Sequence, residues 1–121
     1  MAKTGAGRKL RRNSGFRRAL LRSLATDLLR YEQIKTTVAK AKECSRITNH
    51  LIAVAKKDDL NARRAVAKDI QDREVFKKLF DVLIGRYKDR VGGCTRIFKI
   101  ENRQGDTHSR SELPTVPARD E

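Results

Sequence analysis

The feature that most restricts this chain is the concentration of positive charge at its N-terminal end. The first thirty residues contain nine basic residues and one acid, Asp27, so they carry +8 of the net charge of +14. Residues 31–60, 61–90 and 91–121 carry +2, +4 and 0. Charge spread over a surface serves mainly solubility, whereas charge gathered at one end builds a potential that attracts phosphates. The sequence therefore predicts a polyanionic partner, above all a nucleic acid.

The composition allows one domain with a modest core. The chain has 121 residues, no Trp, 5% aromatic residues and 36% charged residues. We divide it into a basic N-terminal arm at 1–12, a single globular α+β domain at 13–106 and a weakly ordered C-terminal tail at 107–121. The arm has almost nothing apolar to bury, so we expect it to be extended and to become ordered on RNA.

Cysteine use and hydropathy argue against several classes of protein. Cys44 and Cys94 are far apart in a chain without a visible secretory signal, so both thiols are expected to be free in an intracellular setting. They have no metal-ligand spacing with His50 or His108, so no metal and no cofactor are predicted. No apolar run is long enough to span a membrane. The chain also lacks a glycine-rich phosphate loop and a credible Ser-His-Asp arrangement, so neither an enzyme nor a small-molecule substrate is predicted.

Two long segments have apolar residues at helical spacing. The first helix is predicted to begin at Asn13 or Ser14, either of which can cap it, with basic residues on the faces that do not pack. The second is predicted to be the longest helix and runs from Val38 to about Lys57, with Thr37 as its N-cap. The residues expected on the inner faces of these two helices are Phe16, Leu20, Leu24, Leu28, Ala41, Ser45, Thr48, Ile52 and Ala55.

Two shorter helices follow. Asn61 is predicted to cap one that ends near Lys68, and Asp72 to cap another that stops at Gly85. The inner face of the last helix is expected to consist of Val75, Phe76, Leu79, Phe80 and Leu83, whose aromatic rings are interpreted as core residues rather than platforms for bases.

Extended structure is predicted between the first two helices, at 31–37, and after two glycines, at 95–103, because both segments are rich in β-branched residues. The tail past His108 contains Pro114 and Pro117 and few large apolar residues, so no central strand is expected there. The predicted fold class is α+β, with a helical body of about four helices, a small sheet and an extended basic N-terminal arm.

Ordered motifs in this chain resemble those of a known family. Residues 7–14 read GRKLRRNS and 17–25 read RRALLRSLA, followed by EQIKTTVAKAKE at 32–43, RVGGCTRI at 90–97 and RQGD at 103–106. In this order they resemble the bacterial-type large-subunit ribosomal protein seventeen family over about residues 5–106. The resemblance starts inside the arm, which argues against interpreting the Arg-rich start as a mitochondrial presequence. The chain departs from the family at Cys94, where an aromatic residue is common, and in its tail, which lacks the apolar alternation of a last strand.

The resemblance implies a structural constituent of the large ribosomal subunit, with a helical body, a small sheet and an N-terminal extension laid against ribosomal RNA. Its implied partners are large-subunit ribosomal RNA and neighbouring large-subunit ribosomal proteins. The implied location is the ribosome in the cytoplasm of a bacterium, in preference to an organellar ribosome. Composition alone predicts the polyanionic partner but not the ribosome.

The predicted RNA-binding residues are mainly arginines. The first thirty residues hold seven Arg and two Lys. One planar guanidinium can hold two phosphate oxygens or stack on a base, so this bias favours close contact. Basic groups between neighbouring RNA strands also offset phosphate repulsion. The predicted RNA-binding residues are Lys3, Arg8, Lys9, Arg11, Arg12, Asn13, Ser14, Arg17, Arg18, Arg22, Lys35, Thr36, Thr37, Lys40, Lys42, Arg96, Lys99 and Arg103.

Two parts of this prediction have alternatives. The corner at 35–37 leads into a helix N-terminus, which can receive a phosphate, but Thr37 would cap the helix without RNA as well. The turn at 92–93 has the same ambiguity, with Arg96 as the phosphate ligand. The alternative function is a DNA-binding or nucleoid-associated protein, in which one helix would enter a major groove. The spread of basic residues over several segments argues against it.

Overall fold

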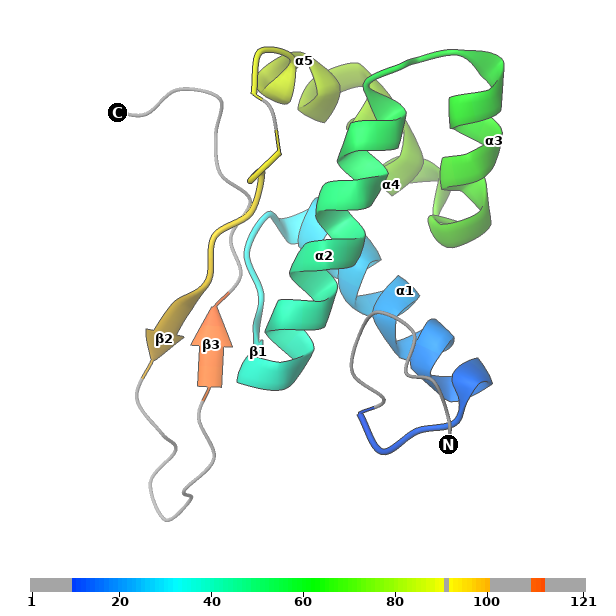
Figure 1. Ribbon diagram of the computed structural model, residues 1–121. Helices are drawn as coiled ribbons and strands as arrows, with labels where there is room; N and C mark the ends of the chain where they lie inside the picture. Colours follow the sequence, from blue (N-terminus) through cyan, green and yellow to red (C-terminus); the bar gives the residue numbers. More distant parts are fainter. Residues whose placement is uncertain (1–9, 91, 101–109, 113–121) are drawn as a thin grey trace.

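The computed structural model describes residues 10–90, 92–100 and 110–112, and it confirms a mainly helical α+β protein with a small sheet (Figure 1). The elements are α1 (Ser14–Tyr31), β1 (Lys35–Thr37), α2 (Val38–Ala55), α3 (Leu60–Asp69), α4 (Arg73–Lys78), the π-helical turn η1 (Leu79–Leu83), α5 (Ile84–Tyr87), β2 (Phe98–Ile100) and β3 (Arg110–Glu112). The arm residues 1–9 lie outside the described residues.

Helix α1 begins where the sequence predicts. The Oδ1 atom of Asn13 accepts a hydrogen bond from the backbone N–H of Phe16 at 3.0 Å, which caps the first turn. The buried residues of α1 are Leu21, Ala25, Leu28 and Leu29. The prediction that Phe16 packs in the core is wrong, since its side chain is 68% exposed. Full burial on α1 begins only at Leu21, and the described part of the chain does not cover Phe16 in the first turn.

Helix α2 packs against α1 and also begins as predicted, with the hydroxyl of Thr37 accepting from the N–H of Lys40 at 3.4 Å. It ends at Ala55 and has 18 residues, so it shares the greatest length among the described helices with α1. Ser45, predicted in the inner stripe, is half-buried, and its hydroxyl hydrogen-bonds that of Thr95 at 2.6 Å. This contact ties the segment before β2 to α2.

Two boundaries of the shorter helices differ from the prediction: the start of α3 and the end of the last helix. Asp59, not Asn61, caps α3, because its carboxylate accepts from the N–H of Ala62 at 2.6 Å. Asp72 caps α4 as predicted, accepting from the two N–H groups that follow. Gly85 does not stop the last helix, which continues through η1 and α5 to Tyr87. Tyr87 is fully buried in the main core cluster, and the burial of its ring stabilises the helical residues that follow Gly85.

The sheet has three antiparallel strands in the order β1-β3-β2. Lys35 and Phe98 both pair with Glu112, and Thr37 and Ile100 both pair with Arg110. The prediction that the tail supplies no central strand is therefore wrong. A three-residue strand between two short partners needs only backbone hydrogen bonds, and Pro114 and Pro117 lie beyond it in the sequence.

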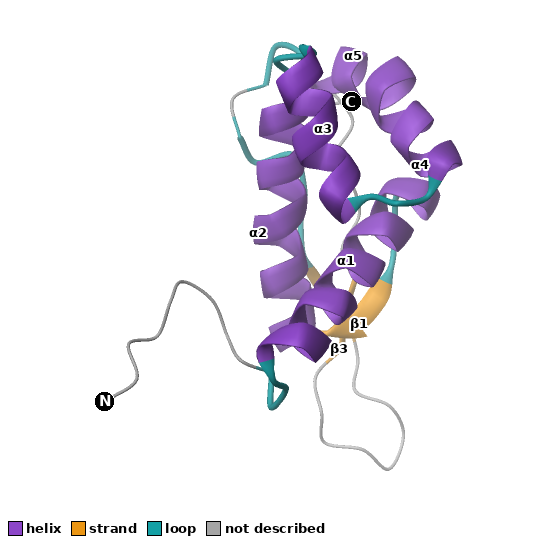
Figure 2. Cartoon of the chain, turned by 90° about the vertical axis from the view of Figure 1, so that its right-hand side faces the viewer, coloured by secondary structure: helices purple, strands orange, loops and turns teal. Residues whose placement is uncertain are grey.

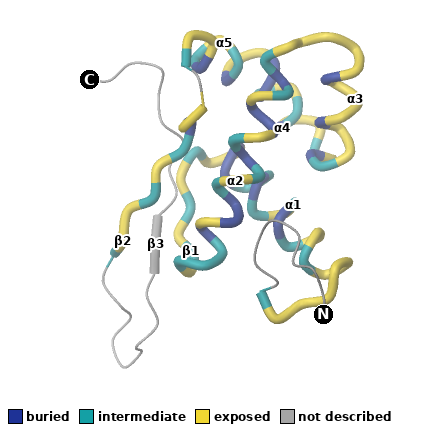
Figure 3. Tube along the Cα trace, in the orientation of Figure 1, coloured by how far each residue is buried: buried dark blue, intermediate teal, exposed yellow. Residues whose placement is uncertain are grey.

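The core lies between the helices, where the buried segments of α1 and α2 face each other (Figure 3). The main cluster joins the inner faces of α1 and α2 to α3, α4, η1 and α5, and a smaller one joins Leu28 and Cys44 to the strands. Phe80 is 9% exposed, with its ring centre 4.8 Å from that of Phe76, so both aromatics belong to the core as predicted. Cys44 and Cys94 are free and buried, and burial raises the pKa of the Cys44 thiol to about 11.

Candidate nucleic-acid interface

The starts of α1 and α2 and the three-stranded sheet lie at one end of the molecule, which we call the basic end (Figures 1 and 2). The other end, formed by the C-terminal part of α2 with α3, α4, η1 and α5, is called the helical end. The predicted RNA-binding residues that the structure describes all belong to elements of the basic end, or to α1 as it leaves that end. Lys3, Arg8, Lys9 and Arg103 lie outside the described residues.

The first surface of the basic end is the start of α1. Residues 10–26 carry five arginines and no acid. The chain turns sharply before the helix, since Leu10 and Arg11 both have φ of 54°. A surface hollow of about 250 Å³ lies beside the start of α1. Ile47 of α2 and Asp69 of α3 help to line it, so α1 lies next to both helices there. The hollow is lined by Ser14, Arg17, Arg18, Leu21, Arg22, Ile47 and Asp69.

Arg22 differs from the other arginines in this group. Its Nε atom donates to the carboxylate of Asp69 at 3.1 Å, so α3 partly neutralises it. Arg11, Arg12, Arg17 and Arg18 make no ion pair with any of the residues that the structure describes. The sequence alone did not distinguish Arg22 from its neighbours.

The second surface is the corner between β1 and α2. Ile34 packs against the smaller core cluster, so β-strand alternation directs Lys35 and Thr37 to the opposite face, where both are exposed. Thr37 does cap α2, as the alternative interpretation requires. Lys42 is exposed and Lys40 half-buried on the first turns of the same helix. The corner thus combines a helix N-terminus with nearby lysines whether or not a phosphate binds there.

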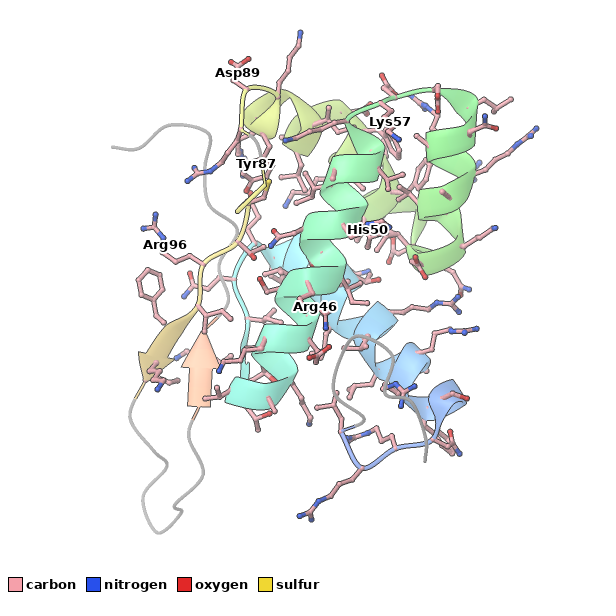
Figure 4. All side chains as sticks on the ribbon, in the orientation of Figure 1. Arg46, His50, Lys57, Tyr87, Asp89 and Arg96 are labelled. Carbon is pink, nitrogen blue, oxygen red and sulfur yellow. The ribbon has the colours of Figure 1, made fainter. Side chains whose placement is uncertain are left out.

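The third surface is strand β2 and the residues before it. Ile97 packs against the smaller core cluster, which leaves Arg96 and Phe98 on the outer face of the strand. The Arg96 side chain points away from the helical body (Figure 4). Its guanidinium carbon lies 6.0 Å from the centre of the Phe98 ring, and Lys99 is exposed on the same strand.

Three cations at the helical end, Arg63, Lys78 and Arg86, have acidic partners. Asp58 pairs with Arg63 at 2.9 Å, and Asp72 pairs with Arg30 where α1 meets α4. Glu32 pairs with both Lys78 and Arg86, which links the end of α1 to α4 and α5. Burial alone would raise the pKa of Glu32, but these two cations outweigh it and hold the pKa below its usual value. These pairs stabilise the body rather than offer charge to a ligand.

Two exposed aromatic residues belong to the basic end, although the sequence did not assign them to the interface. Phe16 lies one residue before Arg17, and Phe98 is 48% exposed beside Arg96. The signal for Phe16 was its place within an arginine-rich turn, ahead of the first buried residue of α1.

Other kinds of site are not evident in the part of the chain that the structure describes. None of its helices has the length and apolar character needed to cross a membrane. Its His, Cys, Asp and Glu side chains form no group of three or more able to hold a metal ion. Arg46 and His50 are both exposed on α2, one helical turn apart (Figure 4).

Comparison with known proteins adds a family and several relatives. The family model described as Ribosomal protein L17 matches residues 20–115. The chain is 54% identical over 99 residues to the large ribosomal subunit protein bL17 of Caldanaerobacter subterraneus subsp. tengcongensis, covering 82% of this chain and 88% of the relative. It is 51% identical over 102 residues to bL17 of Thermus thermophilus, covering 84% and 86%. It is 50% identical over 101 residues to bL17 of Syntrophotalea carbinolica, covering 84% of this chain but 65% of the relative.

Proposed function

The chain belongs to the ribosomal protein L17 family, the one its motifs resemble, and on this premise we propose that it binds and stabilises folded RNA of the large ribosomal subunit. Members of this family are ribosomal proteins, so the role is structural rather than catalytic. Its relatives are bacterial proteins named for the large ribosomal subunit, which supports large-subunit RNA and neighbouring subunit proteins as partners in a bacterial cytoplasm.

The observation that carries this proposal is the distribution of charge between the two ends. Residues 10–26 have five cations and no acid, whereas residues 56–90 have eleven cations and seven acids. A cation without a neighbouring carboxylate keeps its attraction for phosphate, and each phosphate it neutralises releases a counterion. The basic end therefore has the larger capacity to bind RNA per residue.

The proposed contacts divide among three surfaces. Arg11, Arg12, Arg17 and Arg18 at the start of α1 hold phosphates in a forked geometry, with Asn13 and Ser14 beside them. The lysines of the β1–α2 corner and the exposed Thr37 meet a second RNA segment, beside the half-buried Thr36. Arg96, Lys99 and Arg103 meet a third. The basic arm at 1–12 extends the first surface through Lys3, Arg8 and Lys9. A body that touches several RNA segments reduces the repulsion between them.

A DNA-binding role is the second candidate. It would need one helix that presents several side chains to base edges in a major groove. The cations of the basic end instead come from a helix start, a strand-to-helix corner and a strand. This arrangement suits a folded RNA with several nearby backbones better than a single duplex groove.

The first test is retention on ribosomes. The chain should stay with intact large subunits when these are pelleted through high salt, whereas a nucleoid protein should stay with the DNA fraction. Recovery with DNA, and not with large subunits, would contradict the proposal.

A second test addresses the arm. Deleting residues 2–12 removes five cations and no acid. If about four of them meet phosphates, the slope of log affinity against log salt should fall by roughly 3 units. The melting curve should barely change, since the deleted segment has little apolar mass. An unchanged slope would show that the arm does not contact RNA.

A further inference from the structure

Three arginine–aromatic pairs occur in the part of the chain that the structure describes. The guanidinium carbon of Arg30 lies 5.9 Å from the ring centre of Tyr31, that of Arg63 lies 4.8 Å from Phe80, and that of Arg96 lies 6.0 Å from Phe98. These distances are within the range in which a cation is attracted to an aromatic ring. The three pairs nevertheless have different surroundings.

Two of the pairs are neutralised within the protein. Arg30 pairs with Asp72, and Arg63 pairs with Asp58 at 2.9 Å. The Phe80 ring is also buried in the core. Each of these arginines therefore serves a contact between elements of the body, and neither pair offers both a free charge and an open ring.

The third pair, Arg96 and Phe98, combines an arginine without a described ion pair and an exposed ring. Arg96 is exposed and makes no ion pair with the described residues, and the Phe98 side chain is 48% exposed. Phe98 begins β2 and Arg96 lies two residues before it, and both are exposed on the side opposite Ile97, which packs against the smaller core cluster. Glu112 of the central strand pairs with Phe98 on one side and with Lys35 on the other, so the row places an acid position about 5 Å and a lysine position about 10 Å from the strand position of Phe98.

We propose that Arg96 and Phe98 form a platform on which one unpaired base of the bound RNA stacks. The ring supplies the flat apolar surface, and the Arg96 guanidinium holds the phosphate of that nucleotide or of its neighbour. This inference rests on the proposed RNA-binding function and deepens it, since it assigns a single-stranded nucleotide, rather than duplex backbone, to the outer face of the sheet.

The charge around the platform favours a nucleotide over a protein partner. The described segments 33–42 and 92–100 contain five cations and no acid, and one acid, Glu112 of β3, pairs directly with Phe98. A nucleotide combines a flat π surface with a negative charge in one unit, which is the complement of an exposed ring flanked by cations. An apolar contact with a protein would need a larger exposed hydrophobic surface, whereas the Phe98 ring is flanked in sequence by Arg96 and Lys99.

The test compares full-length variants in equilibrium binding to large-subunit ribosomal RNA and to a fully paired RNA duplex of random sequence. Phe98→Leu keeps apolar bulk but removes the ring, and Phe98→Tyr keeps the ring. Tyr31→Leu is the matched control, because Tyr31 is 65% exposed beside an arginine that is already paired. Thermal melting of each variant checks that the body stays folded.

Phe98→Leu should weaken binding to the ribosomal RNA about tenfold without changing its salt slope, since no charge is removed. Its affinity for the duplex should equal that of the wild-type protein, and Phe98→Tyr and Tyr31→Leu should bind both RNAs normally. Equal losses on both RNAs, or no loss on either, would overturn the platform. So would normal RNA affinity combined with poor incorporation into subunits, which would assign Phe98 to a protein contact. Failure of the wild-type protein to bind ribosomal RNA would instead refute the proposed function.

Discussion

The basic end and the helical end of this protein use the same residue types for opposite purposes. At the helical end, some of the arginines and lysines pair with carboxylates and stabilise the body, as in the pairs of Glu32 with Arg86 and of Asp58 with Arg63. At the start of α1, four arginines have no acidic partner among the described residues. The proposed RNA surface is therefore distinguished by the density of its cations together with the absence of acids from residues 10–26, and not by the number of cations alone.

The two ends also differ in how their apolar residues are used. The main core cluster extends from the middle of α1 to α5, so the helical end supplies much of the buried surface. At the basic end, Phe16 and Phe98 stay exposed. Binding and folding should therefore respond to different mutations.

The largest effect is expected from removing the unpaired arginines. Replacing Arg11, Arg12, Arg17 and Arg18 with Gln should reduce the salt slope by roughly 3 units and the affinity for ribosomal RNA roughly 600-fold at about 0.1 M salt, if each meets one phosphate. Competition with wild-type protein for incorporation into large subunits gives a second measurement. The body should melt normally, because none of the four side chains belongs to the core.

A matched variant at the helical end sharpens this result. Replacing Arg64, Lys68, Arg73 and Lys77 with Gln removes the same charge from exposed positions on α3 and α4. RNA affinity should fall far less than in the α1 variant. Equal losses in the two variants would indicate diffuse attraction and would remove the distinction between the ends.

Phe80→Ala should produce the reverse pattern. The ring is almost fully buried against Phe76, so truncation leaves a cavity and should lower the free energy of unfolding by about 3 kcal/mol. Urea denaturation measures the loss. The fraction that remains folded should bind RNA normally; weaker RNA binding with an unchanged unfolding midpoint would assign Phe80 to the interface.

Asn13→Ala should affect both properties modestly. Loss of the cap on α1 should cost about 1 kcal/mol of helix stability and loosen the turn that carries Arg17 and Arg18. Asn13→Ser keeps a capping oxygen and serves as the control. Helicity by circular dichroism and RNA affinity should fall together in the alanine variant only, and a loss of affinity in both variants would instead indicate direct contact of the amide with RNA.

The smallest effect is expected at Glu32, whose half-exposed ion pairs are partly screened by solvent. Glu32→Gln should lower the free energy of unfolding by about 0.5 to 1 kcal/mol at pH 7. Because the pKa of Glu32 is lowered in the folded state, its charged form stabilises the fold above the unfolded pKa, and this stabilisation disappears as the pH falls through the folded pKa. The two unfolding curves should differ at neutral pH and converge in acid. A constant difference at all pH values would exclude an ionic cause.

The sequence predicted the local features of the fold correctly where one short segment contains the whole cause. Asn13, Thr37 and Asp72 cap the helices that follow them because a side-chain oxygen needs only N–H groups two or three residues ahead. The helical spacing of α2 and the family motifs could likewise be read without tertiary contacts. The asymmetry of charge was visible in the same way.

The prediction was wrong where distant residues decided the outcome. Helix continues past Gly85 because Tyr87 finds a buried site, and Phe16 is exposed because the described neighbours of α1 bury this helix only from Leu21 onward. The tail supplies the central strand because two distant strands offer backbone partners. Propensity describes only the local free energy, and burial or strand pairing can outweigh it.

The same distinction between local and distant causes applies to the candidate interface. The sequence by itself determined that the N-terminal region is strongly basic, that α1 and α2 begin where they do, and that the chain belongs to a ribosomal protein family. Only the tertiary structure decided which cations remain unpaired, because Arg22 meets Asp69 and Arg30 meets Asp72 across more than forty residues of chain. Whether a charge is neutralised depends on which groups folding brings within a few ångströms, and sequence distance does not specify that.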